Sequence, residues 1–186
     1  VLVDGVDVRD YTYEALYNKL GYVTQKAVLF SGSIRDNIYF GESAAGEVDL
    51  AKVLELSQAK EFVQKIPEGT EYRIAQLGRN VSGGQKQRLS IARALAREPE
   101  ILIFDDSFSA LDYRTDARLR EGLEEQLHGT TKIIVAQRIS TILHADKIIV
   151  LERGEAVGIG THEELMQNCD VYREIAYSQL SAAELA

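Results

Sequence analysis

The chain has 186 residues, of which 45% are hydrophobic and 27% are charged, and its formal net charge is −8. This composition is typical of a globular domain, long enough to bury roughly 70% of its unfolded surface. The negative charge disfavours nucleic acid and anionic membranes as partners, so a phosphate site must be local. No apolar run reaches the roughly 18 residues that a membrane span needs, and we expect no secretory leader at residues 1–4.

Cysteine and histidine give little support for a metal or redox site. Cys169 is the single cysteine of the sequence, which excludes an internal disulfide framework and favours a reducing compartment. We expect Cys169 to be a packing residue. The three histidines are scattered along the chain and lack metal-ligand spacing, so we do not expect them to bind a metal.

The N-terminal half is predicted to combine one core strand with a helical segment. Residues 1–8 should form a strand edge and a turn, 12–20 a short helix, and 20–24 a strand that leads into Gln25. Further helices are expected at 34–40, 48–57, 60–66 and 85–97, with a polar loop at 69–81. Because this middle third has no convincing strand pattern, we expect a helical subdomain there.

The C-terminal half alternates between apolar strands and helices. Strands are expected at 101–105, 132–136 and 147–151, and helices at 113–127 and 139–143. Continuous apolar strands separated by helices predict a parallel sheet that is buried on both faces. Residues 153–155 should turn the third strand into 156–158, a capping box at Thr161 should start a helix, and a tail helix should follow over 171–180.

The octet Val81–Arg88 is the most informative segment. Ser82 and Gln85 have the spacing of a capping box, and Gly83 and Gly84 allow a ligand to approach the helix start closely. Free N–H groups and the positive end of the helix dipole favour an anion there, most plausibly phosphate. An ordinary capped helix explains the capping box alone, but it does not explain the acidic end of the strand that follows.

The octet resembles the signature motif of ABC-type ATPases, with Val81 in the usual place of Leu. In the family's order, further segments resemble the Q-loop region of exporters (21–25 and 29–38), the Walker B strand (101–105), the D-loop (109–112) and the exporter C-terminal segment (160–165). The chain is therefore identified as a nucleotide-binding domain of an exporter-type ABC transporter. The resemblance implies an α/β fold, with a RecA-like P-loop NTPase core, a mostly parallel sheet and an inserted α-helical subdomain.

The same resemblance implies four segments: 1–33 as the N-terminal part of the ATPase core, 34–98 as the helical subdomain with the signature motif, 99–160 as the core with Walker B and switch region, and 161–186 as C-terminal helices. The phosphate-binding loop, Gly-x-x-x-x-Gly-Lys-Ser/Thr, does not occur in the sequence. Gly41 and Gly46 have its glycine spacing, but Glu47 and Val48 follow, and these residues do not suit phosphate. We therefore expect the chain to begin just after that loop.

The resemblance also assigns roles to residues. Asp105 is expected to hold Mg²⁺, partly through water and together with Gln25, and one carboxylate is chemically sufficient for this ion. The signature residues and Asp112 are expected to bind nucleotide, although Asp112 can also simply cap its helix. The nucleotide-binding residues so implied are Gln25, Ser82, Gly83, Gly84, Gln85, Asp105 and Asp112.

Three residues depart from the family's pattern. Asp106 stands where a catalytic Glu is usual and is one methylene shorter, which matters because a general base must lie within about 2.6–3.2 Å of its proton. Gln137 stands where the switch His is usual, and it cannot ionise. Gln76 replaces a usual Glu in the loop before the signature. We therefore expect nucleotide to be held here with slow or absent hydrolysis, as in the degenerate half of a heterodimeric exporter.

The predicted function is that of the ATP-binding part of an ABC exporter. The expected cofactors are ATP and Mg²⁺, and the expected partners are a second nucleotide-binding domain on a different chain and the coupling helices of a transmembrane domain at the cytoplasmic face of a membrane. Nucleic acid is not expected as a partner, and the chain alone is expected to be inactive. The alternatives are a soluble ABC-type ATPase without transport and a non-enzymatic interaction module, and segments 29–38 and 138–142 favour the exporter.

Overall fold

The computed structural model describes residues 1–40 and 48–180. The glycine-spaced segment from Gly41 to Gly46 therefore lies outside the described residues. The chain divides into two compact units, Val1–Val135 and Ala136–Ala186. Each unit has a hydrophobic core of its own, and each is described separately.

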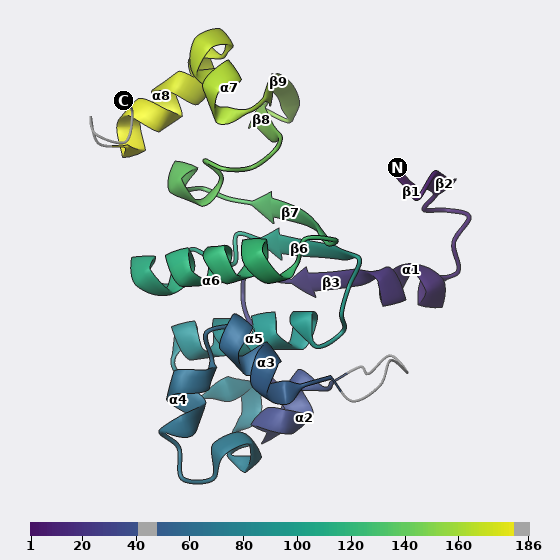
Figure 1. Cartoon of the computed structure of the whole chain (residues 1–186), viewed down its shortest axis with the longest axis vertical. Coiled ribbons are helices and arrows are strands. Elements are labelled where there is room, and N and C mark those ends of the chain that lie inside the picture. Colours follow the sequence, from purple (N-terminus) through teal and green to yellow (C-terminus); the bar gives the residue numbers. More distant parts are fainter. Residues whose placement is uncertain (41–47, 181–186) are drawn as a thin grey trace. The chain divides into compact units, whose positions relative to one another are not determined.

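The first unit is built on a three-stranded parallel sheet in the order β3-β6-β7. The strands are β3 (Leu20–Val23), β6 (Ile101–Asp105) and β7 (Thr131–Val135), and their arrows point the same way in Figure 1. Val23 pairs with Phe104, and Asp105 pairs with Val135. The residues that follow β3 and β6 therefore meet at the carboxyl edge of the sheet, where open α/β sheets place their ligands.

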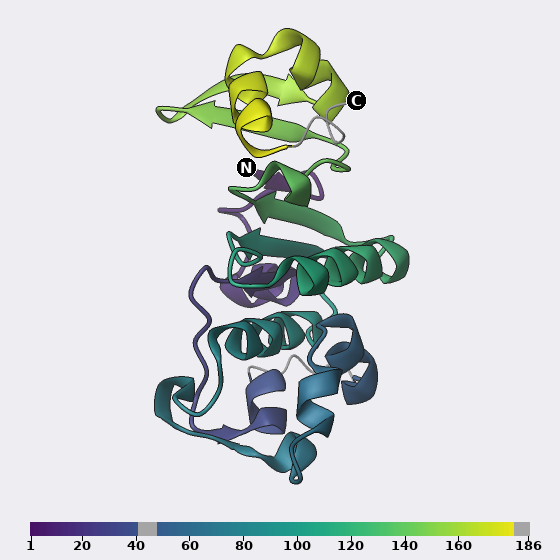
Figure 2. The same cartoon turned by 90° about the vertical axis from the view of Figure 1, so that its left-hand side faces the viewer.

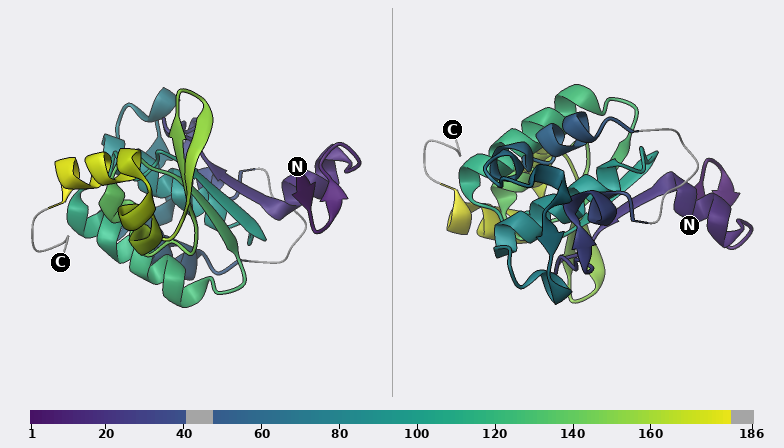
Figure 3. Two further views of the ribbon diagram at one scale, coloured as in Figure 1. Left: turned by 90° about the horizontal axis from the view of Figure 1, so that it is seen from above. Right: turned by 90° about the horizontal axis from the view of Figure 1, so that it is seen from below.

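Helices cover one face of this sheet. α6 (Tyr113–Gln126) runs along the strands (Figures 1 and 3), and α5 (Gly83–Leu95) contacts β3 beside the sheet (Figure 2). Leu102 and Phe104 of β6 are fully buried and belong to the same core cluster as Leu89 of α5 and Leu119 of α6. The predicted short helix is α1 (Tyr13–Lys19), which precedes β3 and has Thr12 as its N-cap.

The opposite face of the sheet is more open. Tyr22, Ile133 and Val135 are 53%, 48% and 52% exposed, respectively. The prediction of a sheet buried on both faces is therefore wrong for the described part of this unit. The strands read as fully apolar because both faces carry Ile, Val or Leu, but α5 and α6 supply apolar cover only to the face of Val23, Leu102 and Phe104.

The helical segment gathers around α5 (Figures 1 and 2). It contains α2 (Ile34–Ile38), α3 (Leu50–Leu56), α4 (Lys60–Gln64) and two 3-10 turns, η1 (Gly69–Glu71) and η2 (Gln76–Gly78). The expected absence of a strand is wrong, because β5 (Arg73–Ile74) pairs antiparallel with β4 (Gly32–Ser33). Two residues are too few to show a period-2 pattern, so the pairing partner alone defines this strand.

Short hairpins occur near both ends of the chain. At the N-terminus, β1 (Leu2–Val3) pairs with β2 (Val6–Asp7). In the second unit, β8 (Ile148–Glu152) pairs antiparallel with β9 (Glu155–Gly160), so the prediction that this third strand joins the parallel sheet is wrong. The reason lies in the connection: Arg153 and Gly154 have φ values of +51° and +86°, and positive φ at both positions is the geometry of a tight hairpin turn.

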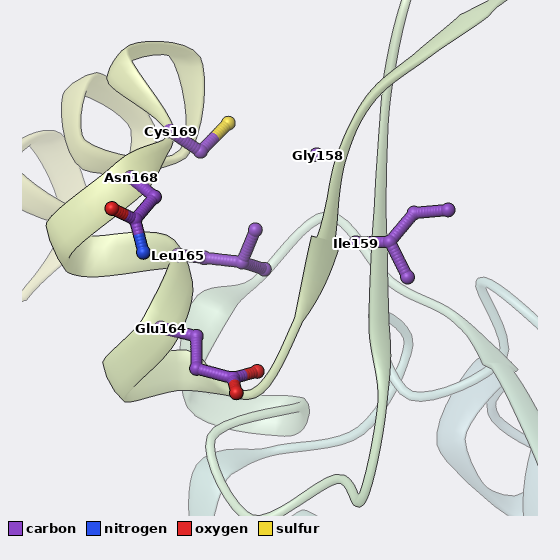
Figure 4. A pocket seen from close by; sticks show the side chains of 6 residues that line it. All are labelled: Gly158, Ile159, Glu164, Leu165, Asn168 and Cys169. Atoms are coloured by element: carbon purple, nitrogen blue, oxygen red, sulfur yellow. The ribbon is translucent and has the colours of Figure 1, made fainter.

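The second unit packs two helices on this hairpin. It also contains η3 (Ile139–Thr141), α7 (His162–Asn168) and α8 (Asp170–Gln179), and the predicted capping box at Thr161 and Glu164 is confirmed. Cys169 is buried in the core of this unit, and a Cβ placed at Gly158 would lie 2.8 Å from its Sγ. Figure 4 shows both residues lining a pocket that contains none of the candidate site residues. Cys169 is therefore a packing residue, as predicted.

Candidate functional site

The start of α5 has the local geometry that the sequence predicts. Ser82 is the N-cap with extended backbone, and its Oγ accepts a hydrogen bond from the backbone N–H of Gln85 at 3.3 Å. The Gln85 side chain accepts in return from the N–H of Ser82 at 2.9 Å. The capping box is therefore closed in both directions, and it holds the first turn without using the N–H groups of Gly83 and Gly84.

Open space lies in front of this helix start. A Cβ placed at Gly83 would meet nothing within 4 Å, and one at Gly84 would lie 3.6 Å from the carbonyl oxygen of Ala110. The loop that contains Ala110 therefore lies beside the first turn of α5. Exposed N–H groups, two residues without side chains and the positive end of a 13-residue helix suit an anionic ligand.

The carboxyl edge of the sheet brings three predicted site residues together with one that was not predicted. Gln25 Nε2 donates to Asp106 Oδ2 at 3.0 Å, and the hydroxyl of Tyr22 donates to Asp105 Oδ2 at 2.9 Å. Asp106 is buried, and its N–H donates to the carbonyl oxygen of Val135 at 2.9 Å. Its φ of +45° lies in the left-handed region, which is uncommon for Asp and turns the chain sharply at the end of β6.

The bond between Tyr22 and Asp105 has an electrostatic consequence. The carboxylate of Asp105 accepts a hydrogen bond from the phenolic hydroxyl, and partial burial adds to this effect, so the pKa of Tyr22 is raised above its usual value. Tyr22 is therefore protonated and remains a hydrogen-bond donor at neutral pH. Within the described residues, Asp105 Oδ1 has no hydrogen-bond partner and stays open as an oxygen ligand.

Asp112 caps α6. Its carboxylate accepts from the N–H of Thr115 at 3.0 Å and from the Thr115 hydroxyl at 2.7 Å. The backbone hydrogen bond from Thr115, and then that from its hydroxyl, lower the pKa of Asp112. The capping alternative is confirmed, and a role of Asp112 in nucleotide binding stays a prediction.

Two predicted positions lie elsewhere. Gln137 belongs to the second unit, where its carbonyl oxygen accepts from Gln179 Nε2 at 2.9 Å, so its geometry is described only within that unit. Gln76 begins η2 and is exposed. Among the described residues, no three Asp, Glu, His or Cys side chains gather as a ready metal cage.

Sequence reasoning missed Tyr22 and two side chains of α5. Gln87 is buried, and its Nε2 donates to the carbonyl oxygen of Thr24 at 3.3 Å. Arg93 donates to the carbonyl oxygen of Val28 at 2.9 Å, so α5 holds the segment that carries Gln25. A usable signal was present, because Gln87 is a polar residue one turn before Ile91 on the buried side of the helix.

Comparison with known proteins assigns the family. A family model described as ABC transporter matches residues 1–109, which is more than half of the chain. The chain belongs to the ABC transporter family. An ABC transporter ATP-binding protein of Mycobacterium bovis is 46% identical over 186 residues and covers 98% of this chain. A putative multidrug export ATP-binding/permease protein of Bacillus subtilis is 42% identical and covers 94% of this chain.

A flippase and a solved exporter extend this similarity. An ATP-dependent lipid A-core flippase of Syntrophus aciditrophicus is 38% identical over 94% of this chain. The structure of a bacterial Atm1-family ABC exporter with ATP bound matches 95% of this chain and 31% of its own, with a TM-score of 0.89 and 34% identity. The predicted α/β P-loop NTPase fold is thereby confirmed.

The chain spans about a third of the length of the curated relatives it matches, namely 32%, 30% and 29% of the mycobacterial, Bacillus and Syntrophus proteins. Within residues 1–40 and 48–180, no helix is both long and apolar enough to cross a membrane.

Proposed function

We propose that this chain is the ATP-binding part of an ABC exporter and that it couples ATP binding and hydrolysis to export. Support comes from the similarity to export proteins and to a flippase at 42% and 38% identity. It comes also from the 0.89 TM-score against an exporter with ATP bound. The single observation that carries the proposal is the open, capped start of α5 beside the Ala110 loop.

Two such domains meet head to tail in this proposal, and each supplies its signature to the nucleotide of the other. Ser82, Gly83, Gly84 and Gln85 then face the phosphates held by the partner domain. Their local geometry supports this role, since the capping box leaves the N–H groups of the two glycines for a ligand. Gln25, Asp105, Asp106 and Asp112 serve the nucleotide site of this chain.

The sheet edge fits a magnesium ion. Asp105 offers one carboxylate oxygen without a partner in the described part of the chain, and the amide of Gln25 donates through its nitrogen, which leaves its carbonyl oxygen unengaged by that bond. Mg²⁺ takes one or two carboxylates and keeps several waters, so this set is sufficient. When bound, the ion neutralises phosphate charge, and the role of Asp105 and Gln25 is to fix its position.

The nucleotide site of this chain is degenerate in this proposal. One carboxylate oxygen of Asp106 already accepts a hydrogen bond from Gln25, and the side chain is one methylene shorter than the Glu that the family places there. Gln137 can hydrogen-bond a γ-phosphate but cannot change its charge near neutral pH. ATP bound here therefore serves mainly to hold the two domains together. Hydrolysis takes place at the site that this chain completes on its partner.

The partners follow from this arrangement. The second nucleotide-binding domain lies on a different chain, and transmembrane coupling helices contact the assembly at the cytoplasmic face of a membrane. Segments 1–33 and 99–160 form the ATPase core, 34–98 the helical subdomain and 161–186 the C-terminal helices. Nucleic acid is not a partner, in keeping with the net charge of −8.

The test is Gly84→Asp in the complete protein, assayed in its purified assembly. A carboxylate in front of the α5 start repels phosphate and fills the space that the ligand needs. Removing one transition-state donor costs about 10²–10³ in rate, so we expect ATP hydrolysis by the assembly to fall at least that far.

Gly129→Asp is the control, because a Cβ at Gly129 meets nothing within 4 Å and one at Gly84 makes only an ordinary 3.6 Å contact, but Gly129 lies in the loop between α6 and β7. It should leave hydrolysis unchanged. If Gly84→Asp assembles normally and hydrolyses ATP at the parent rate, the signature does not complete the partner's site and the proposal fails.

A further inference from the structure

The hydroxyl of Tyr22 is the one donor to Asp105 that the described structure provides from another strand. Tyr22 pairs with Ile103 in the parallel register, and Asp105 lies two residues further along β6 on the same face. The offset is about 6.6 Å along the strand, which the length of a tyrosine side chain bridges. The resulting contact is 2.9 Å long.

The ring of Tyr22 contributes little to the core. The residue is 53% exposed and points to the open face of the sheet, whereas its neighbour Val23 is fully buried. Packing in the core therefore does not require a tyrosine at this position. What the side chain provides is a fixed donor at the oxygen of Asp105 that faces it.

We propose that Tyr22 is a positioning residue for Asp105: by holding Oδ2, it fixes the carboxylate plane so that Oδ1 faces the nucleotide-bound divalent cation. This inference rests on the proposed function. A carboxylate with one oxygen held loses less rotational freedom when the other oxygen takes a ligand. Partners of this kind, which contact a metal ligand rather than the metal, typically change metal affinity by about 10- to 100-fold when removed.

A second feature of the edge supports the assignment. Gln25 bonds Asp106 rather than Asp105, so the two adjacent carboxylates are held by different side chains from the same strand and its extension. Of the two carboxylates, Asp106 is buried, whereas Asp105 has an oxygen without a hydrogen-bond partner among the described residues. Tyr22 sets the direction of that oxygen, and Gln25 keeps the second carboxylate apart.

The experiment measures Mn²⁺ binding by electron paramagnetic resonance in the presence of a non-hydrolysable ATP analogue, using the complete protein in its purified assembly. Tyr22→Phe removes the hydroxyl and keeps the ring. We expect the Mn²⁺ affinity to fall about 10- to 100-fold, while the affinity for the analogue in EDTA stays unchanged. A merely structural role would alter both affinities together.

Two controls separate the outcomes. Tyr39→Phe removes another tyrosine hydroxyl with a 2.9 Å bond, to the carbonyl oxygen of Val48, and should leave Mn²⁺ binding at the parent level. Asp105→Asn should lose at least as much affinity as Tyr22→Phe. If Asp105→Asn weakens Mn²⁺ binding and Tyr22→Phe does not, the inference is overturned and the proposed function stands. If the parent itself binds no Mn²⁺ with the nucleotide analogue, both are overturned.

Discussion

The start of α5 and the carboxyl edge of the sheet both carry candidate site residues, but the side chains of these residues are held in opposite ways. At α5, Ser82 and Gln85 bond each other's backbone across three positions of sequence. At the edge, Tyr22 reaches Asp105 across 83 positions and Gln25 reaches Asp106 across 81. The first arrangement needs only one turn of helix, whereas the second needs the register of two strands.

This difference indicates where a substitution can change one candidate site without disturbing the other. Replacing a residue at the sheet edge alters reach or charge without altering the α5 start, because no hydrogen bond in the described structure joins the two sets. Asp106, Gln137 and Gln76 depart from the family's pattern, whereas Ser82 to Gln85 follow it. In the proposed function, one domain thus loses its own catalysis and still completes its partner's site.

The strongest test of this contrast is restoration of the departing pair, Asp106→Glu with Gln137→His, in the complete protein. The longer side chain recovers the reach of a general base, and a misplacement of about 1 Å costs on the order of 10²-fold in rate. We therefore expect turnover at this chain's own site to rise by up to about 10²-fold. Phosphate release is measured with the other site of the dimer inactivated.

Asp106→Asn with Gln137→His is the control for that pair, because it restores the switch position without a base. It should give no gain. An equal gain in the control, or none in the restored pair, would place the cause of slow hydrolysis outside Asp106.

Glycine-to-alanine substitutions in β3 and at the start of α5 should differ in their effect on stability, because the two glycines differ in the space around them. A Cβ at Gly21 in β3 would lie 2.8 Å from both Leu102 Cδ1 and Pro99 Cγ, whereas one at Gly84 would lie 3.6 Å from its nearest neighbour. Gly21→Ala should destabilise the fold by about 1–3 kcal/mol through overpacking. Gly84→Ala should be neutral or stabilise by up to about 1 kcal/mol, since alanine is favoured in helices. Chemical unfolding of both variants checks this, and equal effects would contradict it.

Local patterns account for what the sequence could predict. The capping boxes at Ser82 and Thr161, the cap of α6 at Asp112 and the strand at residues 101–105 all occur as expected. Each of these features depends on residues within about one turn or one strand of each other. The local geometry at the start of α5 was therefore predictable in detail.

Pairings between distant segments account for what was missed. The prediction that the strand at residues 147–151 joins the parallel sheet is wrong because apolar content does not specify a pairing partner. The bond between Tyr22 and Asp105 depends on the register of β3 against β6, which no single-strand pattern encodes. The exposure of Val135 depends on which face the helices cover.

Ser82→Ala should have a smaller effect than Gly21→Ala, because it removes one side-chain acceptor at an exposed helix start. Loss of an N-cap of this type costs about 1 kcal/mol. Ser82→Thr keeps the hydroxyl and should recover most of this loss. Urea unfolding of the two variants measures it, and a loss of several kcal/mol for Ser82→Ala would show that the α5 start is not locally held.

The smallest expected effect is a pH dependence at the cap of α6. Hydrogen bonds from the backbone and hydroxyl of Thr115 lower the pKa of Asp112 in the folded state. Its contribution to stability is therefore complete above the unfolded pKa of about 3.9 and is lost as the pH falls through the lower folded value. Asp112→Asn keeps an acceptor for Thr115 but removes the titration, so between pH 6 and pH 3 the parent should lose more unfolding free energy than the variant.

Glu124→Gln removes a carboxyl from the exposed side of the same helix, away from its cap, and should follow the parent curve. If the Asp112→Asn and parent curves are parallel down to pH 3, the hydrogen bonds at this cap do not favour the ionised form.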